Sequence, residues 1–127
     1  MSASLSLSAR GNAARRPRDV LEIDVEWTLE APIDLLEARL FWRTEGRGLE
    51  DVAIVEAQSV ESPLPHDKRT FTFALPEGPY SFSGLLTSLQ WAVEVVAGNS
   101  IARWDFVLGP DGAAVTLSSG DMASSVS

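Results

Sequence analysis

Apolar and polar residues alternate strictly along parts of this chain, and a period of two restricts the folds it can adopt. In VLEIDVEWTL, residues 20–29, an apolar side chain occupies every second position from Leu21 to Leu29. Polar side chains, three of them acidic, occupy the positions between. Because successive side chains of a strand point to opposite faces, this pattern predicts a β-strand with one buried and one solvated face.

Similar alternation recurs between stretches rich in proline and glycine. We expect strands over residues 4–9, 20–29, 35–44, 52–60, 69–75, 85–97, 101–108 and 113–117. No segment keeps helical spacing of apolar residues over more than two turns, so the pattern indicates an antiparallel β-sandwich or barrel. The core is expected to be rich in aromatic residues: Trp27, Trp42, Phe71, Phe73, Trp91, Trp104 and Phe106.

Three segments depart from simple alternation. Phe41 falls on the polar face of its strand, where it either covers the stems of neighbouring arginines or belongs to a contact surface. The alternation of residues 52–60 is blurred, which favours an edge position or a β-bulge. GPDG, residues 109–112, is a turn across which residues 113–117 are expected to pair back as a hairpin.

The 127 residues suit a single domain, which we place at residues 1–118. Residues 10–19 form a basic loop, which we expect to be mobile or docked on the acidic face of a strand. Residues 119–127 form a polar tail that we expect to be flexible.

Composition excludes several classes of function. The net charge of −8 opposes binding to nucleic acid, because lysine and arginine contacts to phosphate supply most of that affinity. No cysteine is present, so disulfides, thiolate catalysis and cysteine zinc sites are excluded. A cytoplasmic location is the default expectation, and the absence of cysteine is also compatible with export. No apolar run reaches the roughly 20 residues of a membrane-spanning helix.

Candidate catalytic and metal-binding residues are few. His66, the only histidine, lies in a proline-rich polar loop, and the acids show no metal-ligand spacing. Ser81 lies in GPYSFSG, which lacks the Gly-x-Ser-x-Gly pattern of a hydrolase nucleophile. We therefore expect no enzyme activity, no catalytic residue, no metal and no cofactor.

The segment from Phe71 to Val95 carries a family resemblance. An aromatic strand ends at Pro76, a Pro-x-Ser-Phe crossing spans Pro79 to Phe82, and a strand with a Trp-x-Val-x-Val pattern follows. This order resembles the arrestin-like immunoglobulin-type β-sandwich domains, the fold of arrestins and of the retromer subunit Vps26. The resemblance implies an antiparallel immunoglobulin-like sandwich of seven to eight strands. It also implies a role in protein interaction, although this chain has room for one sandwich where arrestins have two.

Two main hypotheses for function follow, and a third is weaker. The first is a non-enzymatic interaction module that binds an unidentified protein partner by β-augmentation at a strand edge, or through the loop surface around Tyr80 and Phe82. Phe41 is a further candidate for partner binding, and Phe82 has the alternative of a plug between the sheets. The second hypothesis is a self-assembling protein that forms a homodimer through an edge strand. The third is a small-ligand binder that uses apolar space between the sheets.

Overall fold

The computed structural model describes residues 4–11, 13–46, 50–84, 87–110 and 115–116, and every regular element among them is a strand. The ten strands are β1 (Ser4–Ala9), β2 (Ala14–Arg15), β3 (Val20–Thr28), β4 (Leu35–Gly46), β5 (Val52–Glu61), β6 (His66–Ala74), β7 (Phe82–Ser83), β8 (Thr87–Ala97), β9 (Ser100–Leu108) and β10 (Val115–Thr116). Seven of them have six residues or more. The expected all-β fold is confirmed. The expected tail at residues 119–127 lies outside the described residues.

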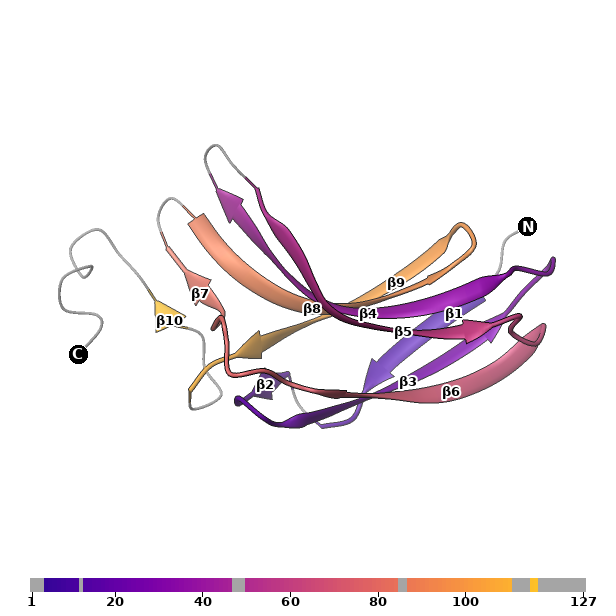
Figure 1. Ribbon diagram of the computed structural model, residues 1–127, viewed down its shortest axis with the longest axis horizontal. Coiled ribbons are helices and arrows are strands. Elements are labelled where there is room, and N and C mark those ends of the chain that lie inside the picture. The colour runs from indigo at the N-terminus through magenta and orange to yellow at the C-terminus, as the bar shows by residue number, and fades with distance from the viewer. Residues whose placement is uncertain (1–3, 12, 47–49, 85–86, 111–114, 117–127) are drawn as a thin grey trace.

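The strands form two facing sheets (Figure 1). The smaller sheet has the order β1-β3-β6, and both of its pairs are antiparallel. The larger sheet follows the path β10-β7-β8-β4-β5, and β9 also pairs with β8. The long strands β4, β5, β8 and β9 pair antiparallel, whereas the short strands β2 and β10 make parallel pairs. The molecule is therefore a β-sandwich.

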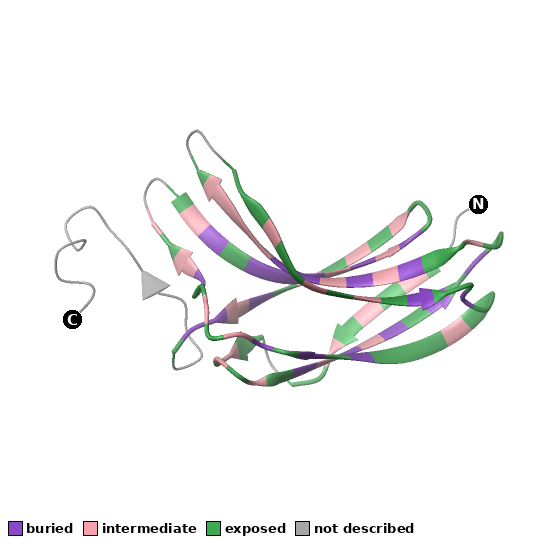
Figure 2. Cartoon of the chain, in the orientation of Figure 1, coloured by how far each residue is buried: buried purple, intermediate pink, exposed green. Residues whose placement is uncertain are grey.

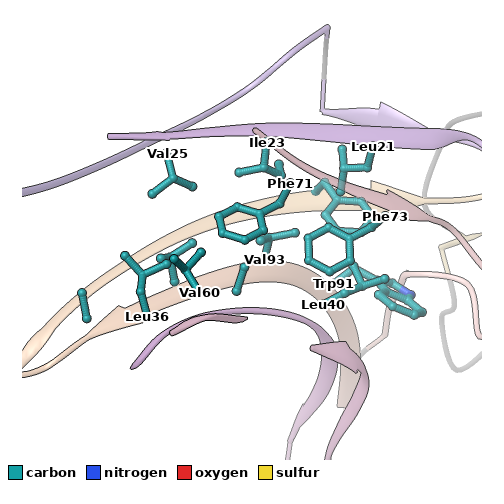
Figure 3. Close-up of a cluster of buried hydrophobic side chains, with 14 of the residues drawn as sticks. Leu21, Ile23, Val25, Leu36, Leu40, Val60, Phe71, Phe73, Trp91 and Val93 are labelled. Carbon is teal, nitrogen blue, oxygen red and sulfur yellow. The ribbon is translucent and has the colours of Figure 1, made fainter. Parts of the chain in front are cut away.

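Alternation places the apolar side chains of both sheets in one core. On the smaller sheet, Ile23 of β3 lies opposite Phe71 of β6. On the larger sheet, Leu40 of β4 lies opposite Val93 of β8. All four side chains are buried, and Figure 3 shows the side chains of the two sheets meeting between the ribbons. The five aromatic core residues Trp27, Phe71, Phe73, Trp91 and Phe106 are buried as expected, and Trp42 and Trp104 pack partly buried against them.

The two fully buried tryptophans also satisfy their polar atoms. The indole N–H of Trp27 donates to the carbonyl of Leu64 at 2.9 Å, and that of Trp91 donates to the carbonyl of Pro79 at 2.6 Å. Each bond ties a strand of the core to the loop that crosses between the sheets. A buried donor without an acceptor would destabilise the fold, so these loops are held in place from the interior.

The expectation for residues 52–60 is confirmed in both parts. Strand β5 ends the path of the larger sheet, and its register against β4 shifts between Leu40 and Phe41. Glu56 lies opposite Leu40 and Ile54 lies opposite Phe41, so Val55 is the extra residue of a β-bulge. Blurred alternation in the sequence is the mark of this inserted residue.

One expectation is wrong, and Phe41 is more buried than its position indicates. Phe41 lies on the polar face of its strand as expected, yet only 7% of it is exposed. It lies opposite Ala92 on the outer face of the larger sheet, and Ala92 is buried as well. Phe41 is therefore covered although it lies outside the core between the sheets. Strand β10 does not turn back onto β9 as a hairpin, because it pairs in parallel with β7.

Candidate functional site

The open edge of β5 is the surface that most resembles a docking site. Among the described strands, β5 pairs only with β4. Its second half approaches the smaller sheet, because the side-chain amide of Gln58 donates to the carbonyl of Thr72 on β6 at 2.7 Å. The described residues show no such bond from Val52–Val55, and this half of β5 rises away from β6 in Figure 1.

The backbone of this first half presents free hydrogen-bonding groups. The N–H of Thr44 on β4 donates to the carbonyl of Asp51 at 2.8 Å, which fixes the direction of the chain at that point. Backbone groups of an antiparallel strand alternate between its two edges. Ala53 therefore turns its N–H and C=O toward β4, and Val52 and Ile54 turn theirs toward the open edge.

The side chains at this edge are apolar and exposed. Val52 is 64% exposed, Ile54 is 56% exposed and Val55 is 45% exposed. Figure 2 shows exposed and half-buried residues along most of β5, in contrast to the buried residues of β4 and β8. An edge strand with free backbone groups and apolar side chains is a template for a further strand. We name residues Val52–Val55 the β5 edge.

The sequence indicates an edge or a bulge at residues 52–60, but it did not single out the three aliphatic side chains or the edge that is open. Its candidates were aromatic: Tyr80 is 37% exposed, Phe82 packs half-buried against the core, and Phe41 is covered. Tyr80 lies just before β7 and Phe82 begins it, whereas Phe41 lies on β4, which β8 separates from β7. The structure therefore does not gather the three into one surface.

The loop at Ser81 is held to the end of β9. The N–H of Ser81 donates to the carbonyl of Leu108 at 2.7 Å, and the N–H of Leu108 donates to the Ser81 hydroxyl at 3.0 Å. Ser81 is itself buried. The Ser81 hydroxyl thus helps to hold the segment before β7 against the end of β9.

Two of the depressions in the described structure lie beside the sheets. The more apolar of the two has a volume of about 390 Å³. It lies beside β8, at the point where the pairing of β8 with β7 ends and its pairing with β9 begins. Phe82, Leu89 and Phe106 contribute to its wall. The other has a volume of about 490 Å³, lies on the outer face of the smaller sheet and is lined by polar residues around Arg10 and Asp24.

The first arginine of the basic loop docks on the acidic face of β3, as one of the sequence hypotheses holds. The guanidinium of Arg10 binds both carboxylate oxygens of Asp24, at 3.0 and 2.9 Å, and lies 3.3 Å from Glu22. The hydroxyl of Thr70 donates to Asp24 at 2.6 Å. The hydrogen bonds from Arg10 and then Thr70 lower the pKa of Asp24 below its usual value.

Later residues of the basic loop also contact the sandwich. Strand β2 pairs with the end of β9, and Arg18 forms an ion pair with Glu77. These contacts place residues 14–18 beside the sheets.

His66 lies on an exposed stretch at the start of β6. Its Nδ1 is 2.8 Å from the hydroxyl of Thr28, and its Nε2 is 3.9 Å from Glu26. The described residues contain no group of three histidine, cysteine or acidic side chains placed to hold a metal ion. In the part of the chain that the structure describes, no helix has the length and apolar character needed to cross a membrane.

Comparison with known proteins shows the fold and no family. No protein-family model matches the chain, and no curated protein matches its sequence. The crystal structure of Spo0M, a sporulation control protein from Bacillus subtilis, matches with a TM-score of 0.57 and 13% identity. The match covers 85% of this chain and 49% of Spo0M, so the chain spans about half the length of that protein.

Two further solved structures match more distantly. A superoxide reductase (neelaredoxin) from Ignicoccus hospitalis has a TM-score of 0.43 and 11% identity, and the match covers 84% of this chain and 80% of that one. A β-glucosidase from Listeria innocua has a TM-score of 0.48 and 12% identity, and the match covers 84% and 16%. At these scores neither protein informs the function of this chain.

Proposed function

We propose that this protein is a non-enzymatic interaction module that binds an extended segment of a partner protein at the β5 edge. The observation that carries the proposal is the combination of free backbone groups at Val52 and Ile54 with exposed aliphatic side chains at the same residues. Added strands gain affinity from the backbone bonds and specificity from alternate side chains. This is the mode of β-augmentation.

The same proposal includes an arrestin-like fold for the domain and a cytoplasmic location for the protein. The fold likeness to a sporulation control protein supports a regulatory β-domain, and the resemblance in residues 71–95 supports the arrestin-like assignment. The absence of cysteine supports a reducing compartment. A regulatory module acts by binding, so the proposal requires no catalytic residue.

Self-assembly through the same edge is the second candidate. A second copy also offers a strand, and unprotected edges pair between identical chains. The bulge at Val55 argues against it, because bulges twist an edge and hinder the approach of another flat sheet. A short extended segment is less hindered than a sheet.

Site-specific photo-crosslinking tests the proposal. A photoreactive amino acid replaces Ile54 in one bait and Ile101 in the control bait, because Ile101 on β9 is similarly exposed at 63%. Both baits are irradiated in native lysate, and the adducts are identified by mass spectrometry. We expect a recurrent foreign protein joined to position 54 and absent at position 101. An adduct with a second copy of the chain favours self-assembly, and equal adducts at both positions contradict the proposal.

A further inference from the structure

We infer that the segment taken up at the β5 edge is basic, with lysine or arginine alternating with aliphatic residues. The inference rests on the proposed function and adds the chemistry of the partner. It follows from the charge of the strand, from the state of the nearby arginines, and from the direction of the free backbone groups.

The β5 edge lies in an acidic stretch. Residues 50–61 contain the four acids Glu50, Asp51, Glu56 and Glu61 and no basic residue. Glu50 and Asp51 are exposed directly before Val52. Glu56 follows Val55 and accepts a hydrogen bond from the amide of Gln58 at 2.8 Å. Acidic side chains therefore flank the aliphatic residues at both ends.

The arginines of the adjacent strand do not neutralise these acids. Arg43 lies opposite Val52, but its guanidinium binds Glu45 and lies 3.1 Å from the amide oxygen of Gln90 on β8. Arg39 binds Glu37 and lies 3.5 Å from Glu94 on β8. In the described structure both cations thus bind groups on β4 and β8, and neither forms an ion pair with an acid of β5.

A segment docked here has a defined pattern. Its backbone meets the outward groups of Val52 and Ile54, which form a short ladder of two residues. Its aliphatic side chains pack on the face that carries Val52 and Ile54, because side chains of paired strands share a face. Its cations then meet Glu50, Asp51 or Glu56. Opposite charges at an exposed edge add little affinity each, but they accelerate encounter and exclude acidic partners.

The same charges oppose pairing between two copies. Each chain carries a net charge of −8, and residues 50–61 offer no base to meet the acids of a second β5. Like charges brought opposite one another across a strand pair are destabilising. A basic segment from another protein is therefore the occupant that the edge favours.

The test uses the full chain and three labelled eight-residue peptides in fluorescence anisotropy. The first alternates lysine and valine. The second has glutamate in place of every lysine. The third is the lysine peptide with alternate backbone nitrogens methylated, which keeps the charge and removes the hydrogen bonds of a strand. We expect the first peptide to bind at least tenfold more tightly than the other two, with affinity falling as salt is raised.

Two variants locate the binding, with one control. We expect I54S to weaken binding of the lysine peptide about tenfold, as loss of a buried aliphatic contact predicts. The double variant E50Q/D51N is expected to weaken binding severalfold and to flatten its salt dependence. I101S removes an equally exposed aliphatic residue from β9 and is expected to leave binding unchanged within about twofold.

Several results would overturn the inference. Equal binding of the lysine and glutamate peptides would refute a basic partner and leave the edge as a docking site. Equal binding of the methylated peptide, or equal loss with I101S, would show charge adsorption without strand pairing. If no peptide binds while position 54 still crosslinks to a foreign protein, the partner chemistry is wrong and the proposed function stands.

Discussion

At the scale of single residues, the ion pair between Arg10 and Asp24 links the basic loop to the smaller sheet. Arg10 lowers the pKa of Asp24, so the pair stabilises the folded chain above the usual pKa of an aspartate, and this stabilisation is lost as pH falls through the lowered value. We expect R10Q to raise the pKa of Asp24 toward about 3.9. Carboxyl-carbon NMR titration measures the change.

The same variant has a matched control and a pH signature. Arg16 binds Asp19 through its backbone N–H, so R16Q keeps that bond and should leave Asp24 unchanged. In urea unfolding, the difference in stability between wild type and R10Q should be present at pH 7 and should be lost as the pH falls through the lowered pKa of Asp24. A difference that persists below that pKa would show that Arg10 acts by packing instead.

The candidate aromatic residues separate by burial. Phe41 is covered, so F41A should lower the free energy of unfolding by about 3 kcal/mol. Tyr80 is exposed, so Y80A should change it by less than about 0.5 kcal/mol. The loss of unfolding free energy in F82A should lie between these two values, because Phe82 is half-buried against the core. Urea unfolding followed by fluorescence measures all three, and a large loss in Y80A would contradict this order.

At the scale of elements, the β5 edge makes a residue-by-residue prediction for amide exchange. The N–H groups of Val52 and Ile54 point outward and should exchange nearly as fast as in an unfolded peptide. The N–H of Ala53 points toward β4 and should be protected. Hydrogen exchange followed by NMR distinguishes the three amides. Protection at Val52 and Ile54 would mean that another chain already covers the edge.

The bulge at Val55 makes the second prediction for this element. Deletion of Val55 keeps the pairs of Leu40 with Glu56 and Phe41 with Ile54, and it leaves a continuous β4–β5 ladder. A regular edge is flatter and pairs more readily with another sheet. We expect the deletion variant to fold and to show a weight-average mass in light scattering that rises with concentration more steeply than for wild type. Adding I54K to the deletion variant should abolish this rise of the weight-average mass with concentration.

Elements also differ in how far the sequence predicts them. Residues 21–29 alternate without exception, and the chain buries Leu21, Ile23, Val25 and Trp27 of β3, and Leu29 just after it, as the period requires. One inserted residue at Val55 breaks the period of β5, so the sequence indicates a bulge or an edge without stating which side chains become exposed. Phe41 is buried outside the core between the sheets, and no local pattern in the sequence records that burial.

The sequence does not predict which strands the short strands pair with, for a related reason. Strand β10 pairs with β7, and β2 pairs with β9, through contacts between segments distant in the chain. Two-residue strands carry no period of their own. Aromatic residues are frequent anchors of interfaces, so the sequence favours aromatic candidates. The exposed aliphatic residues of β5 depend on the pairing of that strand for their role.

At the scale of the whole molecule, the question is whether one sandwich acts as one cooperative unit, since the chain spans about half of Spo0M. Val25 on β3 and Val93 on β8 belong to opposite sheets and share one core. Each sheet shields the apolar face of the other from water, so we expect both sheets to unfold together. In native-state hydrogen exchange, the slowest amides of β3 and β8 should converge on one free energy, equal to that of global unfolding. Convergence on two separate values would show that the sheets are independent units, and the single-domain prediction would then fail.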